Sequence, residues 1–388
     1  MTLATKLEPS PVKRLLALDG GGIRGTLTIE ILAVIEDLLR RELHRDQSFV
    51  LADYFDYIAG TSTGAIIAAC LSLGMPISQV RAFYEANGAA MFDKASLLRR
   101  FRYKFEDDKL AAKLRDVFDG FLPQRERERG QQHVTLGSEA LRTLLLVVMR
   151  NATTDSPWPL SNNPHARYNA PDRPYSNLQI PLWQLVRAST AAPTYFPPEE
   201  VMVGKGQSFL FVDGGVTTYN NPAFLLFLMA TVEAYQLGWP VGVDKMLLVS
   251  VGTGTSAGAN QNLDPSEMNL LYNAASIPAA LMYAALNEQD LLCRVFGRCR
   301  IGSALDREVG NLILTDEEAK RSVLPKHFTY ARYNAELTRP GLDALGLRDI
   351  EPEHVQQLDS VDHIGELQRV GREIGKTVDA SHFAGFLK

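Results

Sequence analysis

The sequence predicts an α/β fold in which a mostly parallel central sheet lies between two layers of helices. Three observations predict this three-layer α/β/α fold. Short apolar runs end at glycine-rich turns, helical spacing of apolar residues follows two of these runs, and the composition is that of an ordinary globular protein. Of the 388 residues, 46% are hydrophobic and 22% are charged, which excludes a disordered chain, a collagen-like repeat and a coiled-coil rod. Strands alternating with helices are typical of a parallel sheet covered on both faces.

The first elements of the chain alternate in this way. Residues 14–18 (RLLAL) form an apolar run ahead of a glycine segment, and we expect them to be a buried strand. Apolar residues then recur every three or four positions over 27–38, which predicts one buried helix face. A second buried strand is expected at 55–59, followed by a helix over 62–73 that Gly74 ends.

The middle of the chain is less regular. Residues 77–120 are expected to be mainly helical, whereas 151–177 are rich in Pro, Asn, Ser and Asp and predict a long irregular loop. Loops of that length inside a compact domain are usually functional, so a lid or a regulatory surface is expected there. The remaining predictions for this part are strands at 143–150, 208–212 and 245–251, and a helix at 223–237.

Three segments are expected along the chain. Residues 1–13 are expected to be a flexible N-terminal tail, and residues 14–225 to form the core that carries the motifs described below. Residues 226–388 are expected to be a largely helical extension that completes the same domain. The sequence contains no internal repeat and no low-complexity tract.

The net charge, the number of cysteines and the length of the apolar runs indicate which partners and which cellular compartment to expect. The 40 basic and 45 acidic residues give a net charge of −5, which argues against a broad nucleic-acid-binding surface. Three cysteines do not make a disulfide framework, and the first residues lack a signal-peptide pattern. The longest apolar runs, such as 274–286, are shorter than the roughly 18 residues that a membrane span needs. We therefore expect a cytoplasmic protein whose contact with a membrane, where it makes one, is peripheral.

The segment Gly60-Thr61-Ser62-Thr63-Gly64 has the pattern G-x-S-x-G between a predicted strand and a predicted helix. That context is the one a nucleophile elbow requires, because the tight turn exposes the serine hydroxyl at the carboxyl edge of the sheet. Glycines on both sides relieve the crowding of such a turn, and the helix that follows directs its positive end at the reaction centre. The alternative is a plain turn in which Ser62 caps the helix.

A second glycine segment, DGGGIRG at 19–25, follows the first predicted strand. One interpretation is the dinucleotide fingerprint G-x-G-x-x-G, although the acidic residue expected at the end of the next strand is missing. The other interpretation is an oxyanion hole. In it the backbone amides of Gly20, Gly21 and Gly22 hold the negative oxygen of a tetrahedral intermediate, and Arg24 adds positive charge or fixes the loop.

Asp213 starts an Asp-Gly-Gly turn after the predicted strand 208–212. On its own this is a common turn sequence, but an acid at the end of a strand on the same sheet edge as Ser62 can accept the serine proton. An aspartate has an ordinary pKa of about 3.9 and is a weak base. It serves only if burial raises its pKa or if the oxyanion hole carries most of the catalysis. The rival arrangement is a Ser-His-Asp triad, for which His327 is the best histidine.

These motifs, in this order, resemble those of the patatin-like phospholipase family. The resemblance covers roughly residues 14–223 and includes the segments DGGGIRG, GTSTG and DGG together with ASTAAPTYFPP at 188–198. It implies a lipid acyl hydrolase with a Ser–Asp dyad and no histidine, in which Ser62 is the nucleophile and Asp213 the base. By the same resemblance, Gly20, Gly21 and Gly22 form the oxyanion hole with Arg24 beside it. Ala65 stands where many members have glycine, a mild departure.

The expected function is therefore that of a phospholipase A or lysophospholipase acting on membrane glycerophospholipids or lysophospholipids. Three alternatives stay open: an acyltransferase using the same site, a lipase effector switched on by a small nucleotide-type ligand, and a nucleotide-binding module without enzyme activity. A homo-oligomer is also left open. No metal site and no cofactor are expected, because H-E-x-x-H, a second cysteine pair and a calcium loop are all missing from the sequence.

Two segments are candidates for lipid contact. Residues 99–105 (RRFRYKF) interleave cations with aromatic rings, as a segment resting on anionic headgroups would. The alternative is a solvated edge of an ordinary element. Within 188–198, the side chains of Ala191, Ala192, Tyr195 and Phe196 could wall an acyl groove, or they could simply pack the core.

Overall fold

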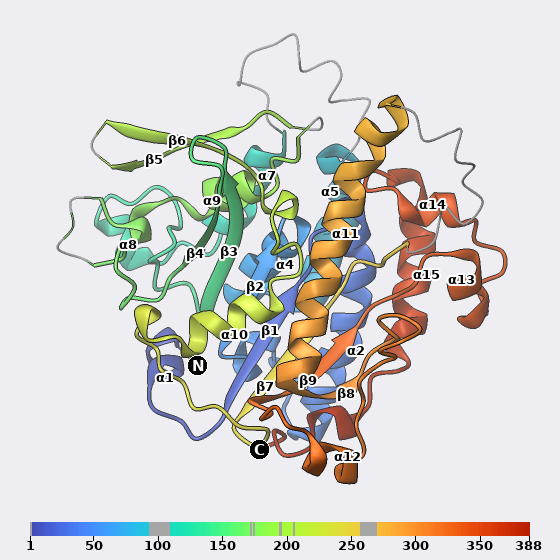
Figure 1. The fold of residues 1–388 in the computed structure, drawn as a ribbon. Coiled ribbons are helices and arrows are strands. Elements are labelled where there is room, and N and C mark those ends of the chain that lie inside the picture. Colours follow the sequence, from blue (N-terminus) through green and yellow to red (C-terminus); the bar gives the residue numbers. More distant parts are fainter. Residues whose placement is uncertain are drawn as a thin grey trace.

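The computed structural model describes residues 2–92, 109–170, 173, 175–193, 196–204, 206–256 and 270–388. The strands of these residues are β1 (Lys13–Leu18), β2 (Tyr57–Thr61), β3 (Leu144–Asn151), β4 (Ser156–Ser161), β5 (Glu199–Gly204), β6 (Gln207–Asp213), β7 (Met246–Val251), β8 (Gly297–Ile301) and β9 (Phe328–Tyr333). They form one sheet in the order β5-β6-β3-β2-β1-β7-β9-β8, with β4 paired to β3 outside that path (Figure 1).

The helices of the described residues cover both faces of this sheet. They are α1 (Leu3–Leu7), α2 (Gly25–Glu42), α3 (Leu51–Tyr54), α4 (Thr63–Ser72), α5 (Ile77–Phe92), α7 (Lys109–Asp119), α8 (Gln124–Glu128), α9 (Leu182–Ser189), α10 (Ala223–Thr231), α11 (Leu270–Phe296), α12 (Asp316–Arg321), α13 (Arg339–Ala344), α14 (Pro352–Gln356) and α15 (Ile364–Gly375). In Figure 1, α10 and α11 lie in front of the sheet.

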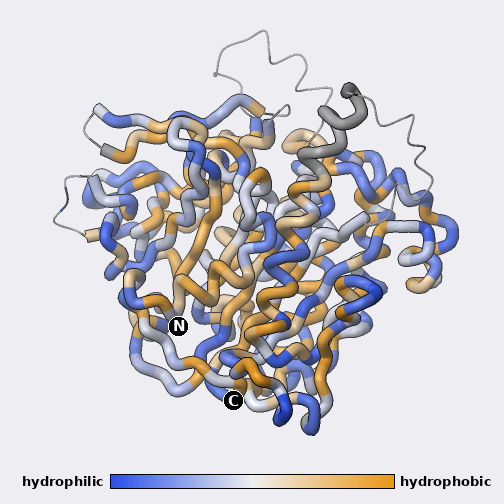
Figure 2. Tube along the Cα trace, in the orientation of Figure 1, coloured by the Kyte–Doolittle hydropathy of each residue, from blue (hydrophilic) through white to orange (hydrophobic). Residues whose placement is uncertain are grey.

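Two hydrophobic clusters separate the three layers. On β1, Leu16 and Leu18 belong to a large cluster with α2, α4, α5 and α15, while Leu15 and Ala17 belong to a smaller cluster with α10 and α11. Successive strand residues point to opposite faces, so one apolar run supplies both clusters. Figure 2 shows that hydrophobic residues follow the strands of the sheet and alternate with hydrophilic residues along the helices. The expected α/β fold with helices on both faces is confirmed.

The six adjacent strands β3-β2-β1-β7-β9-β8 run parallel, and the expected strands are all present. β1 pairs with β2 on one side and with β7 on the other, and β9 and β8 continue the sheet beyond β7. All residues of β2, β7 and β9 are buried, as the near-continuous apolar runs of parallel strands predict. The expected helix at 223–237 is shorter, because α10 ends at Thr231 and a 3-10 turn, Glu233–Tyr235, follows it.

Three segments, 151–177, 226–388 and 1–13, differ from what the sequence predicts. The segment 151–177 is not irregular throughout, since β4 forms within it despite Pro157 and Pro159 and pairs antiparallel with β3. Beyond β4, the buried side chains of Asn163 and Asn169 bond to backbone carbonyls of Tyr235 and Ser161. The first bond joins the segment to residue 235 and the second joins it to the end of β4, which argues against a lid in the described part of the segment.

The C-terminal third contains β8 and β9 as well as helices, and both strands belong to the main sheet. The expected boundary between residues 225 and 226 falls inside α10. At the other end, the segment 1–13 is not a loose tail, because α1 forms and Lys6 is only 3% exposed. The Lys6 ammonium lies 3.3 Å from an Asp56 carboxylate oxygen, and the Lys13 ammonium donates to the Lys6 carbonyl at 2.7 Å.

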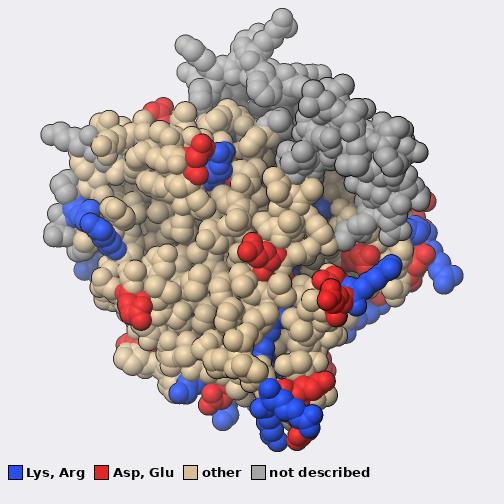
Figure 3. Space-filling view, viewed as in Figure 1, with Lys and Arg blue, Asp and Glu red and all other residues tan. Residues whose placement is uncertain are grey.

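The described helices include none that is both long and apolar enough to cross a bilayer. On the face shown in Figure 3, acidic and basic side chains of the described residues lie interspersed, with no extended area of one sign. The segment 99–105, which the sequence offers for contact with anionic lipid, lies outside the described residues.

Candidate active site

Ser62 occupies the turn between β2 and α4 in a strained backbone conformation. Its φ of 54° and ψ of −125° place it in a region that non-glycine residues rarely adopt. A Cβ at Gly60 would overlap the Gly64 carbonyl, and one at Gly64 would overlap the carbonyl of Leu18. Only glycine fits at both flanks, so the local sequence fixes this sharp turn. The G-x-S-x-G segment therefore has the geometry of a nucleophile elbow.

The Ser62 hydroxyl donates a hydrogen bond to Asp213 Oδ2 at 2.6 Å. Strand β3 brings the two residues together. Its residues 146–151 pair with β4 along one edge, so β2 and β6 share the other edge. On that edge Thr61 of β2 pairs with Val148, and Asp213 of β6 pairs with Met149, the next residue. The parallel β2 and the antiparallel β6 thus end against each other on one template strand.

Asp213 is 5% exposed and well bonded. Its Oδ1 accepts the Gly215 N–H at 2.6 Å, and its own N–H donates to the Ala191 carbonyl at 2.9 Å. Burial raises the pKa of the Asp213 carboxyl to about 6, although the hydrogen bonds from Ser62 and Gly215 oppose this rise. At neutral pH the group is an ionised carboxylate with far more basic character than an exposed aspartate.

A further serine, Ser189, for which no sequence pattern indicates a role, fixes the backbone of the elbow. The Ser62 N–H donates to Ser189 Oγ at 2.9 Å, and the Ser189 hydroxyl donates to the Val148 carbonyl at 2.6 Å. Ser189 belongs to the segment 188–198, in which the sequence predicts side chains that wall an acyl groove or pack the core. In the same segment Ala191 and Phe196 are buried in the core, whereas Tyr195 lies outside the described residues. The described part of this segment therefore packs in the core and holds the Ser62 backbone through Ser189.

The glycine loop after β1 lies against Ser62. A Cβ at Gly20 would be 3.2 Å from the Ser62 Cβ. The Gly20 N–H is not available to an oxyanion, because it donates to the Asn220 carbonyl at 3.0 Å. Among the described residues, no acceptor takes the N–H of Gly21 or Gly22. The expected set of three glycine donors is thus reduced to two.

Protein atoms fill the space beside these glycines. A Cβ at Gly21 would overlap the Thr253 hydroxyl, and one at Gly22, whose φ is 59°, would overlap the Leu358 carbonyl. Close approach here serves packing within the chain, which argues against the dinucleotide interpretation, where a pyrophosphate takes that place. The Thr253 hydroxyl also donates to the Gly20 carbonyl at 2.8 Å.

Arg24 fixes the loop from its far end. Its Nε donates to the Gly21 carbonyl at 3.4 Å, and Nη1 donates to the Gln356 carbonyl at 3.2 Å. Burial lowers the pKa of Arg24 to about 10, against the raising effect of Asp19. The guanidinium therefore stays charged at neutral pH and binds the Gly21 carbonyl of the loop.

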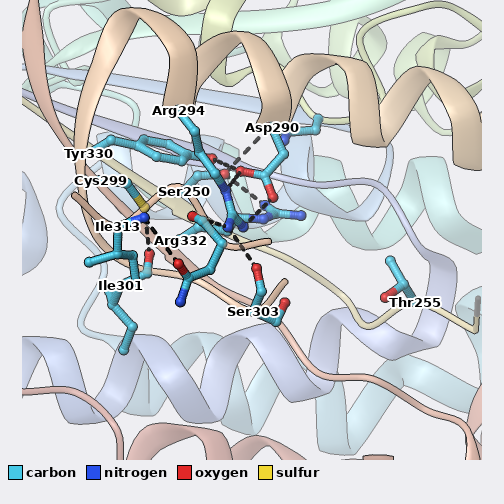
Figure 4. Close-up of polar contacts among 12 residues, drawn as sticks. Ser250, Thr255, Asp290, Arg294, Cys299, Ile301, Ser303, Ile313, Tyr330 and Arg332 are labelled. Carbon is cyan, nitrogen blue, oxygen red and sulfur yellow. Dashed lines mark hydrogen bonds and ion pairs between the residues drawn. The ribbon is translucent and has the colours of Figure 1, made fainter. Parts of the chain in front are cut away.

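A buried ion pair anchors the start of the same loop. Asp19, directly before the glycines, binds Arg332 of β9 through two hydrogen bonds of 2.9 and 2.5 Å. Both side chains are at most 2% exposed. Arg332 also donates to Ser250 Oγ at 2.7 Å, and a second buried pair, Asp290 with Arg294, lies close to it (Figure 4). A lone arginine inside the apolar run FTYARY was the one sequence signal for this anchor.

No histidine of the described residues joins the Ser–Asp pair. His327 directly precedes β9, and its ring stacks on Phe227 with centroids 6.2 Å apart. Ser62 follows the carboxyl end of β2, and the amino ends of parallel strands lie at the opposite edge of the sheet. The rival triad with His327 is therefore excluded by topology.

The family model described as "Patatin-like phospholipase" matches residues 16–227. Patatin-17 of Solanum cardiophyllum is 29% identical over 272 residues, covering 66% of this chain and 64% of its own length. A cGAMP-activated phospholipase of Escherichia coli (strain TW11681) is 30% identical over 260 residues, covering 66% and 65%. The matches thus span less than two thirds of these relatives. The solved structure of human GIVD cytosolic phospholipase A2 with methyl gamma-linolenyl fluorophosphonate covers 99% of this chain and 61% of that one, at 10% identity and a TM-score of 0.42. Because the family model spans more than half of the chain, the protein belongs to the patatin-like phospholipase family.

Proposed function

We propose that the protein is a serine-dependent lipid acyl hydrolase of the phospholipase A or lysophospholipase type. The observation that carries this proposal is the 2.6 Å hydrogen bond from the Ser62 hydroxyl to Asp213 within a strained elbow. The hydroxyl is already directed at a base, and the elbow fixes its position before any substrate arrives.

The dyad supports a two-step acyl transfer. As Ser62 Oγ attacks the ester carbonyl, its proton passes to Asp213, and the carbonyl oxygen becomes an oxyanion. The proton then passes to the leaving alcohol, and an acyl-serine is left. Water, deprotonated by the same Asp213, attacks the acyl-serine and releases the fatty acid with the free serine hydroxyl. One carboxylate acts as base and acid in turn.

Backbone amides supply the oxyanion hole. The N–H groups of Gly21 and Gly22 follow Gly20, which packs against Ser62, and no acceptor among the described residues takes them. Thr63 N–H, at the first position of α4, is the donor that elbows of this kind commonly use. Preset donors of this kind are each worth about 10²–10³ in turnover. Gly20 and Arg24 then have supporting roles, because the first packs against Ser62 and the second orients the loop.

Glycerophospholipids or lysophospholipids are the proposed substrates, reached by peripheral contact with a membrane. The names of the relatives support a lipid ester as substrate. Activation by a small ligand is compatible with the name of the Escherichia coli relative. An acyltransferase would use the same acyl-serine, and product analysis with a competing alcohol acceptor distinguishes it from a hydrolase.

Two substitutions test the proposal. Ser62→Ala and Asp213→Asn should each fold and lower the hydrolysis of lysophospholipid micelles by about 10³-fold or more, whereas Ser48→Ala and Asp155→Asn, both at exposed positions, should match the parent protein. A fluorophosphonate probe should add its mass to the peptide containing Ser62 in the parent only. If Asp213→Asn retains substantial turnover, Asp213 is not the base.

A further inference from the structure

Outside the catalytic site, three half-buried side chains near the C-terminus have the composition of a transition-metal site. His354, His363 and Glu366 each offer a ligand atom, and these atoms all lie within 4.8 Å of one another. We propose that they bind a divalent transition-metal ion of the Zn²⁺ type, and that this ion acts on the glycine loop of the active site. The metal site itself does not depend on the proposed function, whereas its effect on turnover does.

The distances among the three groups suit this chemistry. His354 Nδ1 lies 3.1 Å from one Glu366 carboxylate oxygen, and His363 Nδ1 lies 3.5 Å from the other. Two ligand atoms on one tetrahedral Zn²⁺ lie about 3.3 Å apart, given bond lengths near 2.0–2.1 Å. Two imidazoles and a glutamate form a known zinc-binding set, with water as fourth ligand. Imidazole ligands favour Zn²⁺, Cu²⁺ or Ni²⁺ over Mg²⁺ and Ca²⁺, which prefer oxygen.

Binding requires a small rearrangement of the rings. The imidazoles of His354 and His363 stack with centroids 3.8 Å apart and planes 15° apart. An ion cannot lie in the plane of two stacked rings at once, so one ring must turn about its Cβ–Cγ bond and break the stack. The side chains of His354, His363 and Glu366 are 40%, 32% and 28% exposed. Solvent therefore reaches them, and the ion has an entry path.

The two histidines are the ends of a segment that supports the glycine loop. We call residues 354–363 the strap. In its middle, the Leu358 carbonyl accepts the Ile23 N–H at 2.9 Å, and the Gln356 carbonyl accepts from Arg24 at 3.2 Å. The same Leu358 carbonyl occupies the space beside Gly22. An ion that holds both histidines therefore constrains the two ends of the backbone segment that supports the glycine loop.

Metal binding is tested directly, without reference to activity. Isothermal titration of the Ser62→Ala variant of the 388-residue chain with ZnCl₂ should show one ion per chain, and CoCl₂ should give the visible absorption of tetrahedral Co²⁺. His354→Gln and His363→Gln should each weaken binding at least tenfold. His133→Gln is the matched control, because His133 also faces a carboxylate, Asp119 at 2.7 Å, without a second histidine. If Zn²⁺ does not bind, or binds equally to all variants, there is no site.

The coupling to the active site is tested in the parent protein. One equivalent of ZnCl₂ should lower its turnover severalfold, because an ion bound at both ends of the strap changes the support that the strap gives to Ile23 and Gly22. The same addition should leave the turnover of His363→Gln at its metal-free value, and EDTA should restore the parent. Zn²⁺ that binds the parent without changing its turnover would refute the coupling. A parent protein without hydrolytic activity would refute the proposed function and leave the titration result standing.

Discussion

Asp213 accepts and returns the proton in both steps of the proposed reaction. Its protonation state therefore sets how the rate depends on pH. Burial raises its pKa to about 6, and only the ionised form accepts the Ser62 proton. We expect kcat/KM to rise with pH and to reach half of its plateau near pH 6. Initial rates on a soluble ester substrate between about pH 4.5 and 8 measure this limb. A midpoint near 4, where an exposed aspartate titrates, would show that Asp213 is not the group controlling activity.

The same shift predicts how the stability of the fold depends on pH. Because the folded protein holds the Asp213 proton more tightly than the unfolded chain, the stabilising contribution of this group is complete below about pH 4 and is lost as the pH rises through about 6. Asp213→Asn removes this titration. The melting temperature of the variant relative to the parent should therefore increase by a few degrees between about pH 4 and 7.5. An unchanged difference across that range would contradict the raised pKa.

At the scale of single elements, the elbow depends on glycines that no other residue can replace. Gly60→Ala places a Cβ against the Gly64 carbonyl, so the turn must open, and we expect both a lower melting temperature and a loss of turnover. Gly365→Ala, in α15 with open space around its Cβ, is the matched control and should be neutral or slightly stabilising. Differential scanning calorimetry and a hydrolysis assay measure both effects.

The elements were predictable from the sequence where one residue pattern decides the structure. The strands β1 and β2 are continuous apolar runs, and glycines fix the turns that follow them. The strand β4 was missed because Pro157 and Pro159 oppose a strand locally, and pairing with β3 overrides them. The strand β8 was missed because arginines alternate along GRCRI. In these two cases the deciding interaction comes from a distant strand.

The residues of the candidate site also divide into those that the local sequence predicts and those that depend on contacts with distant parts of the chain. Ser62, Asp213 and the glycine loop were predictable because each belongs to a short contiguous sequence motif. Ser189, Thr253 and the Leu358 carbonyl were not predictable, since each contributes one polar atom from another part of the chain. Even Gly20, correctly placed beside Ser62, has its N–H directed to Asn220, which only the folded backbone reveals.

Across the whole molecule, the ion pair between Asp19 and Arg332 joins β1 to β9 through the intervening β7. Arg332→Met would leave the Asp19 carboxylate buried without its partner, which should cost about 3–5 kcal/mol of unfolding free energy. Adding Asp19→Asn should recover part of that loss, because the unpaired charge disappears. Urea unfolding of both single variants and of the double variant measures the coupling. Additive losses would show that the pair does not act as a unit.

The central position of β1 also limits how the protein can be divided. Residues 16–227, which the family model matches, hold Ser62, Asp213 and the glycine loop, yet β7, which pairs with the whole length of β1, lies outside them. In a fragment ending at residue 227, one side of β1 would be unpaired because β7 is missing, and the Asp19 carboxylate would lack its partner Arg332. An unpaired interior strand favours aggregation. We therefore do not expect residues 16–227 to fold as a separate domain. Ser62 and the glycine loop follow β2 and β1, and the strands that flank β1 come from both sides of residue 227, so the two parts of the chain are needed together to build this site.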